Sequence, residues 1–411
     1  MSHLPMQGVR VLEVAQFTFA PAAGAVLADW GADVIKVEHV AGGDGQRNLR
    51  LGVTTARVGS FAPIMEHPNR GKRSIGLALE KPEAREVLGK LAGYCDVFIT
   101  NFLPAARRRL HIDVADLRAA NPKIIYVRAS AFGARGPEAE KGGYDSSAFW
   151  SRGGSAYHAT PAALAEQGAL LGMPAGAYGD TMGGTTIAGG IAGALFKRER
   201  TGEPSLIDVS LLGMGAWALA LSVDLSLLTG EPMPVGNTTG SLTGGNPTVG
   251  NFRTSDGRFI NLTILQPAAY WKDLCEHLGR PELAGDERFG TPERMTQNSQ
   301  LAGTVVREAI ASRTFAEWLE RLQTLDGQWA PIQNSLEVAR DPQLRANGHI
   351  VPVRDAEGNQ RELVANPVQF DETPPTLRRA PLFAEHTGEL LRELGYDDSA
   401  IRAFNESGAV R

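Results

Sequence analysis

The sequence predicts an α/β protein whose first 135 residues form a Rossmann-like, doubly wound parallel sheet. Two β-branched runs, GVRVLEVA at 8–15 and ADVIKVEH at 32–39, enclose APAAGAVLADWG, which has the composition of a helix ending near Gly31. Glycine is common just beyond a helix end because it adopts the left-handed backbone without steric cost. Strand, helix and strand over about thirty residues form a βαβ unit, and such units build parallel sheets.

The same alternation continues along the chain. KRSIGLAL, DVFITNF and KIIYVRASAFG are predicted strands, and helices are expected at 81–95 and 113–121, the first with Pro82 near its start. Proline suits the first helical turn because its missing N–H has no partner there anyway. A further helix at 185–202 is rich in glycine and alanine, so a neighbouring element could pack closely against it.

A smaller α+β domain is predicted at 225–335. Its Ser-Asp-Gly at 255–257, between two alternating runs, is typical of a β-hairpin, and charged helices are expected at 266–279 and 301–325. Hairpin-like structure is expected at 334–370 and helical structure near the end of the chain. The large domain would then comprise 1–200 and 340–411, with 201–224 as a linking helix; two or three domains suit a chain of 411 residues.

Composition excludes several classes of protein. A net charge of −5 argues against a general nucleic-acid surface. Cys95 and Cys275 have neither metal-ligand spacing nor a disulfide framework, so free buried thiols in a reducing cytoplasm are expected. The N-terminal residues do not show the basic region, apolar core and small-residue cleavage site of a secretory signal peptide, so we expect none. The apolar window at 209–228 contains Asp224 and two glycines, so we expect a helix buried in a core or dimer interface, not a membrane span.

Common cofactor and catalytic motifs are missing. The first strand leads into AQFTFAPAAG without the Gly-x-Gly-x-x-Gly of dinucleotide-binding folds. No P-loop, His-Glu-x-x-His or Gly-x-Ser-x-Gly sequence occurs. We therefore expect neither a metal site nor a permanently bound cofactor.

Two stretches contain candidate site residues. GGYDSSAFWSRGG, at 142–154, sets Asp145 between glycine pairs that could aim backbone N–H groups at a ligand; taken alone, the pattern favours a helix cap. Gln16 and Phe17 follow the first strand, at the sheet edge where such folds bind ligands. Several basic residues follow later strands or open helices and suggest a phosphate-rich ligand: Lys72, Arg73, Lys81, Arg107, Arg108 and Arg109.

The chain resembles the class III CoA-transferase family, which includes formyl-CoA and carnitine CoA-transferases. The likeness runs nearly end to end and in order, through GVRVLEVAQFTFAPAAGAVLADWGADVIKVEH, TNFLPAARRRL, GARGPEAEKGGYD, GDTMGGTTIAGGIAGALFKRERTG, NPTVGNFRTSDGRFI and EHTGELLRELGY. The resemblance implies an interlocked, ring-like homodimer in which each chain has a Rossmann-like large domain and a smaller one.

The resemblance also implies an activity, the transfer of CoA from an acyl-CoA to a free carboxylic acid. It makes Asp145 the nucleophile, which forms a mixed anhydride and then an aspartyl-CoA thioester; CoA is a substrate. Gly142, Gly143 and the Gly244–Gly245 loop are candidate oxyanion donors. The usual Asp-Leu-Lys-Thr-Pro pattern reads ALEKP here, which displaces the lysine to position 81. The implied CoA contacts are Gln16, Phe17, His39, Leu77, Lys81, Asn101, Phe102, Arg109, Leu110 and Ala131.

Two alternatives stay open at this point. The same superfamily contains α-methylacyl-CoA racemases, whose histidine falls at Tyr144, whose glutamate falls at Gln266 and whose aspartate matches Asp180. A tyrosine, with a pKa near 10, is a poor base at neutral pH, which favours the transferase. The other alternative is a non-catalytic CoA-binding homologue. Asp180 could orient the site electrostatically or cap a helix beginning at Thr181.

Overall fold

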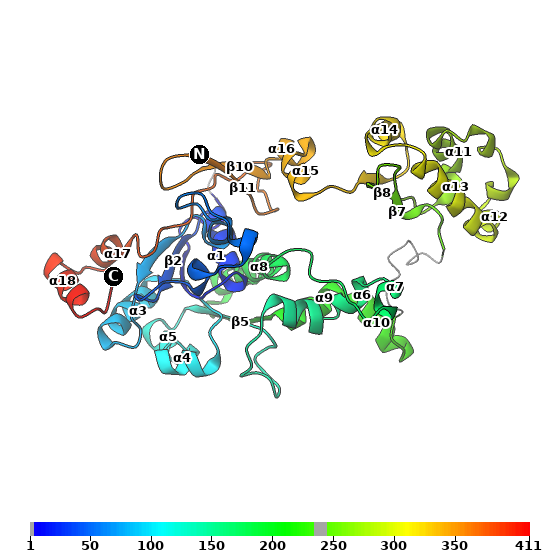
Figure 1. Cartoon of the computed structure of the whole chain (residues 1–411). Helices are drawn as coiled ribbons and strands as arrows, with labels where there is room; N and C mark the ends of the chain where they lie inside the picture. Colours follow the sequence, from blue (N-terminus) through cyan, green and yellow to red (C-terminus); the bar gives the residue numbers. More distant parts are fainter. Residues whose placement is uncertain (1–3, 234–244) are drawn as a thin grey trace. The chain divides into compact units, whose positions relative to one another are not determined.

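The structure is a computed structural model that describes residues 4–233 and 245–411 (Figure 1). The chain divides into two compact units, each made of segments distant in sequence. The first comprises Met1–Ser155, Met173–Leu225 and Asp341–Arg411, and the second Ala156–Gly172 and Ser226–Arg340. Residues 156–172, expected in the large domain, thus group with the smaller unit.

A six-stranded parallel sheet forms the centre of the first unit. Its order, β3-β2-β1-β4-β5-β6, is that of Rossmann folds, which confirms the predicted α/β class. The prediction of one linking helix at 201–224 is wrong in part. Residues 206–210, LIDVS, form a sixth strand that pairs with β5. The strands are β1 (Arg10–Val14), β2 (Asp33–Glu38), β3 (Arg73–Gly76), β4 (Val97–Thr100), β5 (Ile125–Ser130) and β6 (Leu206–Ser210).

Helices cover both faces of this sheet because adjacent strand residues point to opposite sides. Val11 packs in a core with α1 and α8, whereas Leu12 packs in a second core with α3, α5 and α17. The helices of this unit include α1 (Phe19–Asp29), α2 (Pro63–Asn69), α3 (Pro82–Tyr94), α4 (Pro104–Leu110), α5 (Val114–Ala120), α8 (Tyr178–Thr201), α9 (Leu211–Ala218), α16 (Pro342–Ala346), α17 (Thr387–Glu393) and α18 (Asp398–Glu406), with 3-10 turns η1 (Gly45–Asn48) and η2 (Gly52–Thr55) and a π-helix, η3 (Ser146–Arg152).

The close packing expected of the glycine-rich helix is present between α8 and α1. A Cβ atom added at Gly184 would lie 2.5 Å from the Cβ of Ala22, and one added at Gly183 would lie 2.2 Å from the Phe19 ring. Real Cβ atoms do not approach neighbours so closely, so the spacing of these two helices requires glycine at both positions.

The second unit contains a three-stranded antiparallel sheet packed with helices. The predicted hairpin at 255–257 joins its first two strands, and Gly257 has the positive φ, 80°, that the turn needs. The helix expected at 301–325 is interrupted at Thr314, which starts a new helix with a capping box. Its elements are β7 (Val249–Arg253), β8 (Phe259–Thr263), β9 (Trp329–Pro331), α6 (Ser155–Ala159), α7 (Ala162–Glu166), α11 (Pro267–Leu278), η5 (Pro281–Leu283), η6 (Glu287–Phe289), α12 (Pro292–Gln297), α13 (Ser299–Ala311), α14 (Phe315–Arg321), η7 (Leu322–Thr324) and α15 (Ser335–Arg340).

Two further expectations need correction. The segment at 334–348 contains the helices α15 and α16, and the predicted hairpin-like structure begins only with β10 (Ile350–Arg354) and β11 (Gln360–Val364).

The apolar window at 209–228 is not one buried helix. The helices α9 and α10 (Ala220–Thr229) are bent by 76° relative to each other, and α10 has no buried residue. Within the described residues no single helix could cross a membrane, although this bent pair has the length and composition to do so. Both cysteines are unpaired and buried, as expected.

Candidate active site

A cavity of about 1160 Å³ opens at the carboxyl end of the parallel sheet in the first unit. Gln16 follows β1, Asn101 follows β4 and Ala131 follows β5, and all three line it. Strands β1 and β4 are the neighbours at which the strand order reverses, and in open α/β sheets ligands bind at such a point. The topology alone therefore makes this cavity the candidate active site.

Hydrogen bonds hold the backbone after β1 in one conformation. The Gln16 N–H donates to Asn101 Oδ1 at 3.1 Å, and Asn101 Nδ2 donates to the Gln16 carbonyl at 2.7 Å. Phe17 has a left-handed backbone, with φ of 63°, which is unusual for a side chain of this size. Its ring meets that of Tyr144 edge-on at 5.7 Å. The site thus has a rigid aromatic wall beside the switch point.

A buried charge network supports Phe17 from beneath. The Phe17 N–H donates to Asp44 Oδ1 at 3.0 Å, and Asp44 Oδ2 lies 2.8 Å from Lys36 Nζ. Lys36 also pairs with Glu13 at 3.0 Å. Burial opposes the charge on Lys36, but the carboxylates of Asp44 and Glu13 outweigh it and raise its pKa. Sequence reasoning missed Asp44, since AGGDGQRN carries no signal beyond that of a polar turn.

Most of the predicted CoA contacts come together in this cavity. Leu77 does not line it; that residue is 1% exposed and borders a smaller adjacent space. Lys81 is also absent from the cavity wall, because its ammonium group donates to the Ser407 carbonyl. Eight predicted residues do line the cavity: Gln16, Phe17, His39, Asn101, Phe102, Arg109, Leu110 and Ala131.

Asp145, the predicted nucleophile, lies behind the cavity wall. Its side chain is 5% exposed, and it is absent from the cavity lining. Asp145 Oδ2 accepts the Gly179 N–H at 2.9 Å, and the Asp180 amide also donates to this carboxylate. Asp145 Oδ1 is buried without a hydrogen-bond partner. The expected cap of the following helix is not formed; the carboxylate instead caps the N-terminus of α8.

Asp180 does line the cavity. It lies in the first turn of α8, which begins at Tyr178, so it does not cap a helix starting at Thr181. Burial, and secondly the charge of Asp145, raise the pKa of Asp180 to about 7. Burial also raises the pKa of Asp145, although its two backbone hydrogen bonds oppose the shift. The site therefore pairs a sequestered carboxylate with one that faces the cavity.

The glycines of GGYD also border the cavity. Gly142 and Gly143 both line it, and within the described part of the chain neither N–H has a hydrogen-bond acceptor. A Cβ at Gly143 would lie 2.9 Å from that of Ala131, so the close approach of this segment to the end of β5 needs glycine. Of the other proposed loop, Gly245 is described with φ of 91°, and Gly244 lies outside the described residues.

Comparison with known proteins assigns the family. The sequence profile of CoA-transferase family III matches residues 6–387. The chain belongs to this family. The likeness stated from the motifs is thereby confirmed, and a CoA-transferase of family III acts on acyl-CoA and carboxylate substrates.

Relatives named as CoA-transferases align with nearly the whole length of this chain. (R)-2-hydroxy-4-methylpentanoate CoA-transferase of Clostridioides difficile is 28% identical over 99% of both chains. Succinate–glutarate CoA-transferase of Agrobacterium fabrum is 32% identical, covering 95% of this chain and 96% of its own. Among solved structures, a CaiB/BaiF family protein from Brucella suis matches with a TM-score of 0.80 at 28% identity, over 96% of this chain and all of its own.

Proposed function

We propose that this family III CoA-transferase works through an aspartyl mixed anhydride and an aspartyl-CoA thioester, and that Asp180 carries the acyl group. This assignment departs from the one that the motif resemblance implied. One observation supports the change: of the two neighbouring carboxylates, Asp180 lines the cavity, whereas Asp145 is 5% exposed and accepts backbone N–H groups of α8.

The proposed reaction needs no redox step and no net proton transfer. The Asp180 carboxylate attacks the thioester carbon, the C–S bond breaks, and CoA leaves as a thiolate. That thiolate attacks the aspartyl carbonyl of the anhydride, which releases the donor acid as a carboxylate. The acceptor carboxylate then attacks the aspartyl carbonyl of the thioester, the C–S bond breaks, and a second mixed anhydride forms with release of CoA thiolate. The thiolate attacks the acceptor's acyl carbon, which gives the new acyl-CoA and expels Asp180 as a free carboxylate. Covalent catalysis of this kind divides one difficult exchange into easier steps.

The N–H groups of Gly142 and Gly143 are our candidates for stabilising the oxyanions. Both glycines border the cavity, and neither amide is used within the described chain. One well-placed donor in an oxyanion hole is worth about 3–4 kcal/mol of transition-state stabilisation. Arg109, exposed on the cavity wall at the end of α4, is suited to a CoA phosphate because guanidinium groups bind phosphate oxygens in pairs.

Asp145 has a different role in this proposal. Its carboxylate binds the amides of Gly179 and Asp180, and so sets where the first turn of α8 lies. A Cβ at Gly179 would lie 2.5 Å from Asp145 Oδ1, which shows how closely the carboxylate is packed there. Its charge also raises the pKa of Asp180, which makes that carboxylate more basic.

The decisive experiment traps the intermediate. Wild-type enzyme, Asp180→Asn and Asp145→Asn are incubated with acyl-CoA, digested, and examined by mass spectrometry for CoA attached to a peptide. We expect an adduct on the Asp180 peptide in the wild type and in Asp145→Asn, and none in Asp180→Asn. An adduct on Asp145 would restore the assignment from the motif resemblance.

Acceptor acids for this assay come from the names of the relatives. These include a 2-hydroxy-4-methylpentanoate enzyme, a succinyl-CoA–malate enzyme from Chloroflexus aurantiacus and a succinate–glutarate enzyme. We propose that the acceptor is a small carboxylic acid of these kinds. Label exchange between each free acid and its CoA ester, measured in parallel, identifies the preferred one.

We also propose an interlocked homodimer. What supports it is apolar surface on α9 and α10 that the single chain leaves uncovered: Trp217 is 82% exposed, and Leu227 and Leu228 are 79% and 81% exposed. Large apolar side chains exposed to this extent are typical of protein–protein contacts. Light scattering during gel filtration measures the mass in solution.

A further inference from the structure

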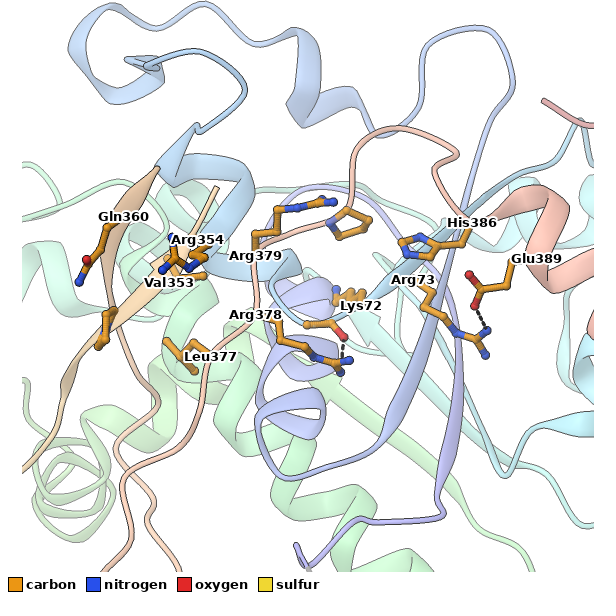
Figure 2. Close-up of a pocket in the computed structure, with 13 residues that line it drawn as sticks. Lys72, Arg73, Val353, Arg354, Gln360, Leu377, Arg378, Arg379, His386 and Glu389 are labelled. Carbon is orange, nitrogen blue, oxygen red and sulfur yellow. Dashed lines mark hydrogen bonds and ion pairs between the residues drawn. The ribbon is translucent and has the colours of Figure 1, made fainter. Parts of the chain in front are cut away.

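Lys72 is a buried cation that the proposed reaction does not use. It lies between α2 and β3, and it is one of the residues that line a second cavity of the first unit, about 810 Å³ in volume (Figure 2). Its side chain is nevertheless fully buried. Burying an ammonium group costs free energy unless the charge is paired, so the partners of Lys72 indicate its role.

Three acceptors surround the ammonium group of Lys72. Its Nζ lies 2.6 Å from Glu13 Oε2, and it also donates to the Pro21 carbonyl at 2.8 Å and to Asn69 Oδ1 at 3.1 Å. All three donors of the ammonium group are used, which leaves none for the phosphorylated ligand that the sequence suggested. Burial lowers the pKa of Lys72 to about 7, although the charge of Glu13 opposes this shift, so the group is charged at about pH 6.

Glu13 connects Lys72 to the charge network beneath Phe17. Its Oε2 accepts from Lys72, and its Oε1 lies 3.0 Å from Lys36 Nζ. Lys36 Nζ lies 2.8 Å from Asp44 Oδ2, and Asp44 Oδ1 accepts the Phe17 N–H at 3.0 Å. A continuous series of buried ion pairs therefore runs from Lys72 to Asp44 and ends at the backbone of Phe17.

The charges of this series cancel. Two carboxylates, Glu13 and Asp44, alternate with two ammonium groups, Lys36 and Lys72, and all four side chains are fully buried. Removing one member of a buried pair leaves an uncompensated charge, which is far more costly than removing both members. Loss of Lys72 alone leaves two carboxylates to share Lys36, whereas loss of Lys72 and Glu13 together leaves Lys36 paired with Asp44.

Helix α1 has room for this series because position 24 is glycine. A Cβ atom added at Gly24 would lie 2.2 Å from Glu13 Oε2 and 2.8 Å from Lys72 Cε. Real Cβ atoms do not approach neighbours so closely. The Glu13–Lys72 pair is therefore packed directly against α1, the helix that starts just after Phe17.

Phe17 has a backbone conformation that needs support. Its φ of 63° lies in the left-handed region, which bulky side chains rarely adopt, and its N–H is held by Asp44. Its ring lies on the wall of the active-site cavity, edge-on to Tyr144 at 5.7 Å. A shift of Asp44 would release the Phe17 backbone and with it the position of the ring.

We propose that Lys72 is a positioning residue for the binding of CoA. Through Glu13, Lys36 and Asp44 it holds the backbone of Phe17 in the left-handed conformation, and so keeps the ring on the cavity wall. Lys72 does not itself line that cavity, so it acts on the affinity for CoA and not on the chemical step. The inference rests on the proposal that CoA binds in the active-site cavity.

Calorimetric titration of CoA into the full-length protein at about pH 6, where Lys72 is charged, measures the effect. We expect the Kd for CoA to rise roughly tenfold or more in Lys72→Met, with kcat nearly unchanged. Glu13→Gln/Lys72→Met should recover most of the affinity, because Lys36 and Asp44 stay paired. Lys72→Gln is the second variant, to be used where Lys72→Met does not fold, and the same rise in Kd is expected of it.

Arg70→Met is the matched control. Arg70 pairs with Asp29 at the end of α1 at 2.7 Å, and both side chains are almost fully buried, but neither residue lines the active-site cavity. Loss of this pair should lower the midpoint of thermal unfolding about as much as Lys72→Met does. The Kd for CoA should stay at the wild-type value.

Three results would overturn the proposal. One is wild-type affinity for CoA in the folded Lys72→Met or Lys72→Gln protein, which would make the role of Lys72 purely structural. Another is an equal rise in Kd in Lys72→Met and Arg70→Met, which would indicate a general loosening of the core. The third is the absence of recovery in Glu13→Gln/Lys72→Met.

A further variant separates this inference from the function on which it rests. Arg109 lies on the wall of the active-site cavity, so Arg109→Gln should weaken the binding of CoA. Unchanged affinity in Arg109→Gln would place CoA outside this cavity and overturn the underlying proposal together with the inference. Weaker binding in Arg109→Gln with unchanged binding in Lys72→Met would overturn the inference alone.

Discussion

Two carboxylates near the N-terminus of α8 differ in what surrounds them, and their proposed roles follow from that difference. Asp145 is buried away from the cavity lining, and its backbone hydrogen bonds only partly offset the burial that raises its pKa. Asp180 faces the cavity, and burial together with the charge of Asp145 raises its pKa to about 7. A carboxylate with a raised pKa is a stronger nucleophile once it is ionised.

The pKa of Asp180 predicts a pH profile. Because the ionised form attacks, kcat/KM should rise with pH, by about tenfold per unit below pH 7, and level off above it. Asp145→Asn removes a negative charge that raises this pKa, so its profile should shift toward lower pH. Initial rates from about pH 5.5 to about pH 8.5, roughly one and a half units either side of the midpoint, provide the test. An unshifted profile in an active Asp145→Asn enzyme would contradict the coupling.

Asn101 is predicted to determine affinity for CoA. Asn101→Ala removes both hydrogen bonds that hold Gln16, each worth about 1 kcal/mol, so the Kd for CoA should rise by about tenfold or more. Isothermal titration measures it. The control is Asn405→Ala on α18, whose Nδ2 donates to the Ile401 carbonyl far from the cavity lining. Equal Kd values for CoA in Asn101→Ala and Asn405→Ala would contradict the prediction that Asn101 holds Gln16 in place for CoA binding.

At the scale of elements, the helix pair α1 and α8 determines where Asp180 lies. Glycines on α8 let the two helices approach, and the same helix starts at the cavity. Gly184→Ala would force a Cβ to within 2.5 Å of Ala22, and overpacking of this kind costs about 1–3 kcal/mol of stability. We expect a lower midpoint of thermal unfolding and reduced activity.

The same helix offers a matched control. Gly189 is exposed, and a Cβ there would meet no atom within 4 Å. Gly189→Ala should therefore stabilise the protein by up to about 1 kcal/mol through helix propensity alone. If both alanine variants shift the unfolding midpoint in the same direction, close helix packing is not what these glycines provide.

At the scale of the whole molecule, the exposed apolar side chains of α10 predict association. Leu227→Asp/Leu228→Asp places two charges on that surface, which should shift the protein from dimer toward monomer in light scattering. Val53→Asp is the control, because that side chain is 90% exposed on a different element, η2. A wild-type monomer, or a dimer unaffected by the double substitution, would exclude this surface as the interface.

The first five strands of the sheet were predictable because each is a short β-branched run separated from the next by a helix or turn signal. The sixth strand was not, since LIDVS adjoins an apolar run and only pairing with β5 makes it a strand. Gln16 and Asn101 were likewise recognised by motif, and the sheet topology brings them together from 85 positions apart.

Local sequence thus determined the α/β class, the glycine-rich helix and the hairpin at 255–257, and the family resemblance supplied eight of the residues that line the cavity. The tertiary structure alone decided which aspartate faces that cavity, since exposure depends on how α8 meets the GGYD segment and not on either motif. It also placed Asp44 under Phe17, through contacts between residues 27 positions apart. The physical reason is that burial and electrostatics are properties of the assembled core, whereas helix and strand patterns are properties of neighbouring residues.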